Sequence, residues 1–290
     1  MPQVTDWSIP GCDSQPILGN THLPAPGGNA EPEAAVGVLL ICHGFKGYKD
    51  YGFFPHLAQA AASAGLIAHR FNFSHSGMTN HIDTFERPDL FERDTWRKQV
   101  DDLKAVIDAV QLGTLPGQAK PLAIFGHSRG GLTALLTAGE PAVSEKLAAV
   151  IAASSPSAAS RLDPDQIEML KRVGRLPSPS SRTGQTLYVG RQWQDQIDQD
   201  PAWHDPRRAI AAIRCPVMLI QGEDDTTVPV NESQDLHRAR PDAKVLLIER
   251  ASHTYNAPNP LPLDQKPPKE TQQMIDAACA FAVEHCTHKK

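Results

Sequence analysis

The stretch PLAIFGHSRGG (121–131) carries the strongest pattern in the sequence. An apolar run leads into Gly126-His127-Ser128-Arg129-Gly130, which matches G-x-S-x-G, and a leucine- and alanine-rich run follows. This motif is typical of a sharp turn between a buried strand and a helix, where glycines allow the close approach that leaves the serine hydroxyl exposed. We therefore predict a strand over 121–126, a helix over 131–139 and a nucleophile at Ser128.

Apolar runs and helical patterns alternate on both sides of this motif. The apolar runs predict buried strands over 36–42, 66–73, 147–154, 215–222 and 243–249, with short strands near 4–9 and 16–22. Helical spacing predicts helices over 53–65, 95–112, 231–240 and 270–285. Strands that alternate with helices imply right-handed crossovers. The prediction is an α/β fold with a mainly parallel central sheet and helices on both faces.

A serine hydroxyl needs a base, and the base needs an acid that orients it. In this fold the chain order is serine, acid, histidine. In QGEDDTTVP (221–229) we predict Asp225 as the acid rather than Asp224, because Asp225 begins the loop after an apolar strand. His253, in the loop after strand 243–249, is the predicted base. The other histidines after the acid fall in predicted helices or in the tail: His237, His285 and His288.

Two backbone amides are predicted to stabilise the oxyanion that forms on the substrate. One is the N–H of Arg129, directly after the serine. The second is the N–H of Phe45, in the loop after strand 36–42, where Gly44 allows a close turn. We expect His43 to hold that loop through a ring hydrogen bond.

Residues 155–206 break the alternation and are predicted to form a cap insertion in a single domain that spans 1–290. A helix is expected near 163–173 and a hairpin near 181–190. Five residues are predicted to border the substrate pocket, although those of the insertion would also serve to pack it onto the domain: Lys46, Tyr48, Met169, Tyr188 and Trp193.

Four motifs occur in order along the chain: HGF (43–45), GHSRGG (126–131), GEDDTTVP (222–229) and SHTY (252–255). Together they resemble the α/β-hydrolase superfamily, and most of all its small dienelactone-hydrolase-like, cinnamoyl-esterase-like and serine-aminopeptidase-like branch. The resemblance runs through HGFKGYKDYGFFPHLAQAAASAGLIAHRFNFSHSG (43–77). It implies the α/β-hydrolase fold, with Ser128, Asp225 and His253 as the triad and the amides of Phe45 and Arg129 as the oxyanion hole.

The amino-acid composition limits the kinds of molecule that the protein is expected to bind. Hydrophobic residues make up 40% and charged residues 21% of the 290 residues, and the net charge is −5. This balance supplies no cationic field, which argues against nucleic acid or an anionic membrane surface as a partner. No apolar run approaches the roughly 20 residues of a membrane helix. The five scattered cysteines favour neither a zinc site nor a disulfide framework, so we expect a cytoplasmic protein without a metal.

The leading functional prediction is a cofactor-independent serine hydrolase that acts on a small-molecule carboxylic ester. An alternative is the same triad acting on an amide or thioester, as an aminopeptidase-like enzyme, a thioesterase or an acyltransferase. An aminopeptidase would need an acidic cap residue to hold a free amine, and the acidic residues available are Glu168, Asp195, Asp198 and Asp200. A third hypothesis, from a different class, is a non-catalytic binding protein on a hydrolase scaffold.

Overall fold

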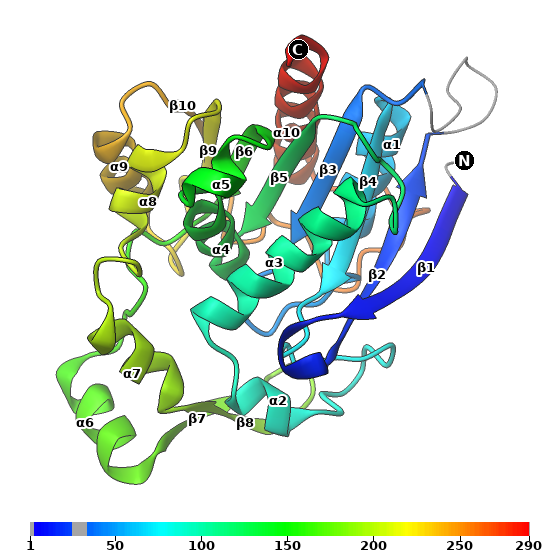
Figure 1. Ribbon diagram of the computed structural model, residues 1–290. Coiled ribbons are helices and arrows are strands. Elements are labelled where there is room, and N and C mark those ends of the chain that lie inside the picture. Colours follow the sequence, from blue (N-terminus) through cyan, green and yellow to red (C-terminus); the bar gives the residue numbers. More distant parts are fainter. Residues whose placement is uncertain (1–2, 25–33, 290) are drawn as a thin grey trace.

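The computed structural model describes residues 3–24 and 34–289, so residues 1–2, 25–33 and 290 of the predicted single domain lie outside the described residues. Within those ranges, eight strands form one sheet in the order β1-β2-β4-β3-β5-β6-β9-β10 (Figure 1). Their bounds are Gln3–Pro10, Pro16–Leu23, Leu66–Asn72, Gly37–Cys42, Leu122–His127, Leu147–Ala153, Val217–Gly222 and Lys244–Ile248 in that order. Strand β2 is antiparallel to β1 and β4, and every other pair is parallel. The predicted mainly parallel sheet is confirmed.

Helices cover both faces of the sheet. On one face lie α1 (Phe54–Ser63) and α10 (Lys269–His288), and on the other lie α3 (Trp96–Gln111), α4 (Arg129–Ala138) and α9 (Val230–Ala239) (Figure 1). Alternate side chains of β3 enter two separate cores: Val38 and Leu40 face the α3 and α4 side, whereas Leu39 and Ile41 face α1 and α10. A strand covered on both faces needs an unbroken apolar run, which explains why these segments could be recognised.

Helix α3 shows how the sequence sets the ends of an element. The Thr95 side chain accepts a hydrogen bond from the Lys98 N–H and caps the first turn. Its apolar stripe is buried against the sheet, and Gly113 follows with a left-handed φ of 77°. The observed bounds lie within one residue of the predicted range.

The segment between β6 and β9 contains five short elements: α6 (Pro164–Val173), β7 (Arg175–Pro179), β8 (Thr186–Gly190), α7 (Gln192–Gln199) and α8 (Pro206–Ala212). The hairpin begins earlier than predicted, because β7 pairs with β8 and residues 180–185 form the turn. The first strand of the hairpin contains two prolines, Pro177 and Pro179. Proline donates no ladder hydrogen bond, but a two-stranded ribbon has open edges that tolerate it.

The region after β4 continues into a short helix, α2 (Pro88–Glu92), that packs against β8. Another short helix, α5 (Pro141–Ser144), follows α4. The Phe85 N–H donates to Gln185 Oε1 at 2.8 Å, and Gln185 Nε2 donates to the Phe85 carbonyl at 3.0 Å. This reciprocal pair fastens the β7–β8 hairpin to the main body, below the carboxyl ends of the parallel strands (Figure 1).

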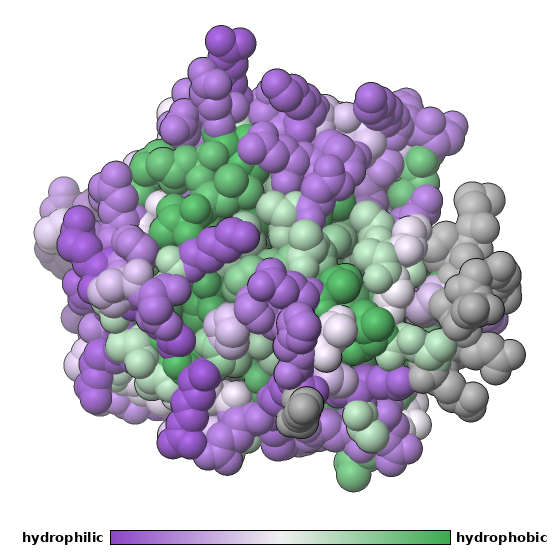
Figure 2. All heavy atoms as spheres, turned by 90° about the horizontal axis from the view of Figure 1, so that it is seen from above, coloured by the Kyte–Doolittle hydropathy of each residue, from purple (hydrophilic) through white to green (hydrophobic). Residues whose placement is uncertain are grey.

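Figure 2 shows the opposite end of the molecule, where the amino ends of the parallel strands lie. Hydrophobic patches there are interspersed among hydrophilic residues. No helix within 3–24 and 34–289 combines the length and the apolar character that crossing a membrane would require.

Candidate active site

Ser128 occupies the turn between β5 and α4 in a strained conformation, with φ 55° and ψ −122°. The flanking glycines are required by close packing. A Cβ atom on Gly126 would lie 2.1 Å from the Gly130 carbonyl oxygen, and one on Gly130 would lie 2.4 Å from the Cys42 carbonyl oxygen. The G-x-S-x-G spacing is therefore explained by backbone contacts on both sides of the serine. Helix α4 starts two residues earlier than the predicted range.

The structure brings the three predicted triad residues together. His253 Nε2 lies 3.0 Å from Ser128 Oγ, and His253 Nδ1 lies 2.8 Å from Asp225 Oδ2. Asp224, the neighbour that we did not choose, is exposed. The arrangement can move a proton from the serine hydroxyl to a histidine whose other ring nitrogen faces a carboxylate.

Asp225 is fixed by several donors. Its Oδ1 accepts hydrogen bonds from the amides of Thr227 at 2.9 Å and Val228 at 2.8 Å, and Gln221 Nε2 donates to Oδ2 at 3.1 Å. Burial opposes ionisation of the carboxyl group, but the bond to His253 and these amides outweigh it and lower its pKa. The carboxylate is thus held ionised and oriented toward the histidine.

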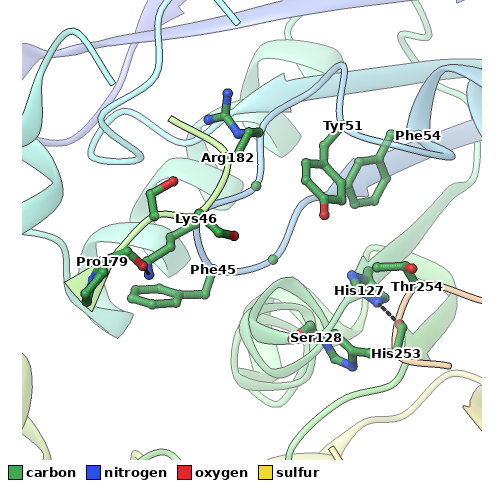
Figure 3. Close-up of a pocket in the computed structure, with 14 residues that line it drawn as sticks. Phe45, Lys46, Tyr51, Phe54, His127, Ser128, Pro179, Arg182, His253 and Thr254 are labelled. Carbon is green, nitrogen blue, oxygen red and sulfur yellow. Dashed lines mark hydrogen bonds between the residues drawn. The ribbon is translucent and has the colours of Figure 1, made fainter. Parts of the chain in front are cut away.

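His127, the variable residue before the serine, supports the candidate base. Its Nε2 lies 2.8 Å from the His253 carbonyl oxygen, the contact drawn as a dashed line in Figure 3. Burial lowers the pKa of His127 to about 3, and the nearby His253 adds to the effect. A neutral ring donates Nε2–H to that carbonyl. Sequence reasoning missed this residue because nothing in the motif distinguishes its side chain.

The loop after β3 passes directly beside Ser128. A Cβ atom on Gly44 would lie 3.1 Å from the Ser128 Cβ, so only glycine fits without displacement. His43 Nδ1 donates to the Gly44 carbonyl at 2.8 Å, and His43 Nε2 accepts from the Phe73 N–H at 3.3 Å. The predicted ring hydrogen bond is confirmed, and burial lowers the pKa of His43 to about 4.

Two amides at this turn remain available to a ligand. Among the described residues, neither the Phe45 N–H nor the Arg129 N–H donates a hydrogen bond to another group. Phe45 follows the glycine that touches the serine, and Arg129 begins α4, whose positive end faces the same space.

Two unlike cavities meet at Ser128, and both also share Phe45 in their walls. The smaller has a volume of about 220 Å³ and a mixed wall that includes several polar side chains, among them Lys46, Ser180, Arg182, His253 and Thr254 (Figure 3). The larger, of about 570 Å³, is mainly apolar, and its wall includes Leu162, Met169, Leu176, Val189, Trp193 and Val228.

The predicted pocket residues divide between these cavities and the interior. Lys46 lines the smaller cavity and donates through Nζ to the Pro179 carbonyl at 2.6 Å. Met169 and Trp193 line the larger one. Tyr48 lies outside the described walls of both, because it is buried with its hydroxyl donating to Asn259 Oδ1 at 3.2 Å.

Tyr188 also lies outside both described walls. Strand alternation explains its position, since its neighbours Leu187 and Val189 point to the opposite face of the hairpin. The Arg175 guanidinium instead covers the Tyr188 ring at 4.1 Å.

None of the acidic cap residues considered for an aminopeptidase is found in the described walls of the two cavities. Three of them form ion pairs instead: Asp195 with Arg191 at 3.0 Å, Asp198 with Lys171 at 3.1 Å and Asp200 with Arg97 at 2.7 Å. Within the described part of the chain, no group of three or more His, Cys, Asp or Glu side chains could hold a metal ion.

Comparisons with known proteins agree with this architecture. Residues 38–270 match the model of the alpha/beta hydrolase family. Est1E from Butyrivibrio proteoclasticus with bound ferulic acid is similar in structure, with a TM-score of 0.72 and 18% identity over 96% of this chain and 98% of that one. A dienelactone hydrolase from Anabaena variabilis has a TM-score of 0.63 and 17% identity, over 98% of both chains. The predicted fold class is confirmed.

A curated relative matches over a shorter stretch. It is the RutD protein of Pseudomonas savastanoi pv. phaseolicola, whose name describes a carbamate hydrolase, and it is 38% identical over 61 residues. That stretch covers 21% of this chain and 24% of the relative.

Proposed function

Because the chain belongs to the alpha/beta hydrolase family, we propose that it is a serine hydrolase that cleaves a carboxylic ester through an acyl-enzyme on Ser128. One observation carries the proposal: the unbroken line of contacts from Ser128 Oγ through the His253 ring to Asp225, with distances of 3.0 and 2.8 Å. Asp225 holds the tautomer in which Nε2 of the histidine is free to accept the serine proton.

In the proposed mechanism, His253 removes the proton from Ser128 as its oxygen attacks the ester carbonyl. The amides of Phe45 and Arg129 bind the oxyanion, which is the group that gains most charge in the transition state. His253 then protonates the departing alcohol. A water molecule, deprotonated by the same histidine, releases the acid from Ser128.

The two cavities support an assignment of the two halves of the substrate. The leaving alcohol must lie near His253, which protonates it, and His253 lines the smaller cavity, where polar side chains such as Lys46 and Arg182 also lie. The acyl chain then occupies the larger apolar cavity under α6 and β7. The segment over 155–206 acts as a cap, and the substrate is a small-molecule ester of a bulky apolar acid with a small polar alcohol.

Hydrolysis of p-nitrophenyl acetate and butyrate tests this proposal. We expect Ser128→Ala to lose at least about a thousandfold in kcat, since the nucleophile is removed while the fold is kept. Equal rates for the wild type and Ser128→Ala would exclude a serine mechanism. A fluorophosphonate probe that left Ser128 of the folded protein unmodified would favour the alternative of a non-catalytic binding protein.

A second candidate is attack on a carbamate or amide by the same triad. The partial match to a protein named as a carbamate hydrolase supports it. The ion-paired acidic residues of the cap argue against an aminopeptidase, because they leave no carboxylate in the described cavity walls to bind a free amine. The rates of hydrolysis of ester, thioester, anilide and carbamate substrates that share one acyl chain would show which type of bond is cleaved fastest.

We also propose a cytoplasmic location. All five cysteines, which fall within the described residues, are free thiols, as is usual in a reducing compartment.

A further inference from the structure

The side chain of Arg129 contacts the other residue that we assign to the oxyanion hole. Its guanidinium carbon lies 5.4 Å from the centre of the Phe45 ring, within the range of a cation–π interaction. The Phe45 ring is 41% exposed and also contacts Phe91, with ring centres 5.2 Å apart. An exposed ring on a loop has few contacts that fix it. The contact with Arg129 therefore helps to determine where the loop lies.

Two residues at the start of α3 hold the guanidinium in place. Arg129 Nη2 lies 3.1 Å from Asp94 Oδ2, and the Arg129 guanidinium carbon lies 4.8 Å from the Trp96 ring centre. All three residues are buried, with exposed fractions of 6%, 8% and 4% for Asp94, Arg129 and Trp96.

Further hydrogen bonds fix the two partners. Gln99 Nε2 donates to Asp94 Oδ2 at 2.6 Å, and Trp96 Nε1 donates to the Ala159 carbonyl at 3.1 Å. Asp94 and Trp96 are therefore held in turn by α3 and by the beginning of the cap.

A buried ion pair is not needed to start a helix. Desolvation of two charges is costly, and apolar residues of similar size often replace such a pair without loss of stability. Here burial lowers the pKa of Arg129 and raises the pKa of Asp94, so the site disfavours the charged form of each group. Arg129 Nε and Nη2 make no hydrogen bond with a described group, so the 3.1 Å contact of Nη2 with Asp94 is an ion pair without hydrogen-bond geometry. The guanidinium is placed by what surrounds it: Asp94 attracts its charge, and the Trp96 and Phe45 rings lie 4.8 and 5.4 Å from its carbon.

We propose that Asp94 and Trp96 are positioning residues of the oxyanion hole. They hold the Arg129 guanidinium against Phe45, and so tie the loop that carries one amide donor to the helix that carries the other. This inference rests on the proposed serine-hydrolase function. It concerns the tetrahedral oxyanion, so it predicts an effect on kcat rather than on KM.

The test compares Asp94→Asn and Arg129→Met with the wild type, using p-nitrophenyl acetate, whose acyl group is too small to fill the larger cavity. We expect kcat to fall about tenfold, with KM changed less than twofold. The affinity for a boronic acid that forms a tetrahedral adduct on Ser128 should fall in parallel with kcat. Arg129→Lys, which keeps the charge, should recover part of the loss.

The chain offers a matched control on the same helix. Arg97 pairs with Asp200 at 2.7 Å and covers the Trp203 ring at 4.2 Å, the same combination of residue types on the surface. Arg97→Met and Asp200→Asn should leave kcat and boronic acid affinity unchanged. If Asp94→Asn does not fold, a double-mutant cycle of Phe45→Leu and Arg129→Met tests the inference instead. Two residues that act through one contact give losses in kcat that are not additive.

The outcomes separate the two proposals. Normal hydrolysis by the wild type together with unchanged kcat in the variants would overturn this inference alone, as would additive losses or a change confined to KM. A wild type without Ser128-dependent hydrolysis would overturn the proposed function, and this inference with it.

Discussion

The ring Nε2 of His127 lies 2.8 Å from the carbonyl oxygen of His253, so the residue before the candidate nucleophile holds the backbone of the candidate base. The two rings also contact each other at an interplanar angle of 47°, with centres 4.8 Å apart. The loop after β10 is thereby attached to the end of β5. The end of one strand, β5, therefore positions both the candidate nucleophile and the candidate base.

Replacing His127 by phenylalanine keeps a ring in the buried site but removes this hydrogen bond. We expect kcat to fall about 10- to 100-fold with little change in KM, because a small displacement of the base is costly. Steady-state kinetics with p-nitrophenyl butyrate would measure it. His56→Phe is the matched control, since His56 Nε2 contacts the Pro262 carbonyl at 3.0 Å at an exposed position. An equal fall in kcat in His127→Phe and His56→Phe would refute a specific role of His127 in positioning the base.

Ionisation of Asp225 should stabilise the folded protein at neutral pH. Its pKa is lowered from the ordinary value of 3.8, so the contribution is present above pH 3.8 and is lost as the pH falls through the lower folded-state value. Thermal unfolding between pH 2 and 7 should show a smaller acid-induced loss of stability for Asp225→Asn than for the wild type. Parallel curves of stability against pH for the wild type and Asp225→Asn would contradict the prediction. The same variant should lose on the order of a thousandfold or more in kcat at neutral pH.

Filling the larger cavity should change the preference for acyl chains. Leu176 is buried and lines that cavity, so Leu176→Trp should lower kcat/KM for the octanoate ester at least tenfold relative to the acetate ester. A series of p-nitrophenyl esters of increasing chain length gives the readout. Val173→Trp, at an exposed position near the end of the same helix-hairpin unit, should leave the series unchanged. An unchanged series in Leu176→Trp would place the acyl chain elsewhere.

Adding a methyl group at Gly126 should disrupt the turn that holds Ser128. The new atom would lie 2.1 Å from the Gly130 carbonyl oxygen, and such overpacking destabilises by about 3 kcal/mol. Gly184→Ala is the control: its φ is 69° and no atom lies within 4 Å of the new position, so we expect only about 1 kcal/mol. Urea unfolding measures both. Gly126 does not have a left-handed φ, so a loss no larger than that of Gly184→Ala would mean that the contact with Gly130 does not set the requirement for glycine.

The sequence predicted most of the sheet because its strands are buried on both faces. Continuous apolar runs such as 36–42 are typical of strands covered on both faces, and the motif around Ser128 indicated the direction of the chain at the site. The choice of Asp225 and His253 followed from chain order, and the structure brings both within hydrogen-bond distance of their expected neighbours.

The cap was harder to predict because its contacts are not periodic. Tyr188 was chosen for its aromatic side chain, but strand alternation turns it away from the cavity that Val189 lines. Leu162 and Leu176 are single apolar residues among polar ones, and no pattern distinguishes them from surface leucines. The links of His127 to His253 and of Arg129 to Asp94 join segments far apart in the chain, and one sequence alone gives no signal of such pairs.

Under the proposed mechanism, the meeting of two cavities at Ser128 also sets an order for product release. The alcohol, formed first, would leave the space beside His253 while the acyl chain still fills the larger apolar cavity. The vacated space gives the hydrolytic water a path to the histidine that must deprotonate it. We therefore expect turnover to follow a ping-pong sequence in which the acid leaves last. An added alcohol small enough for that space would then compete with water and capture the acyl group as a new ester.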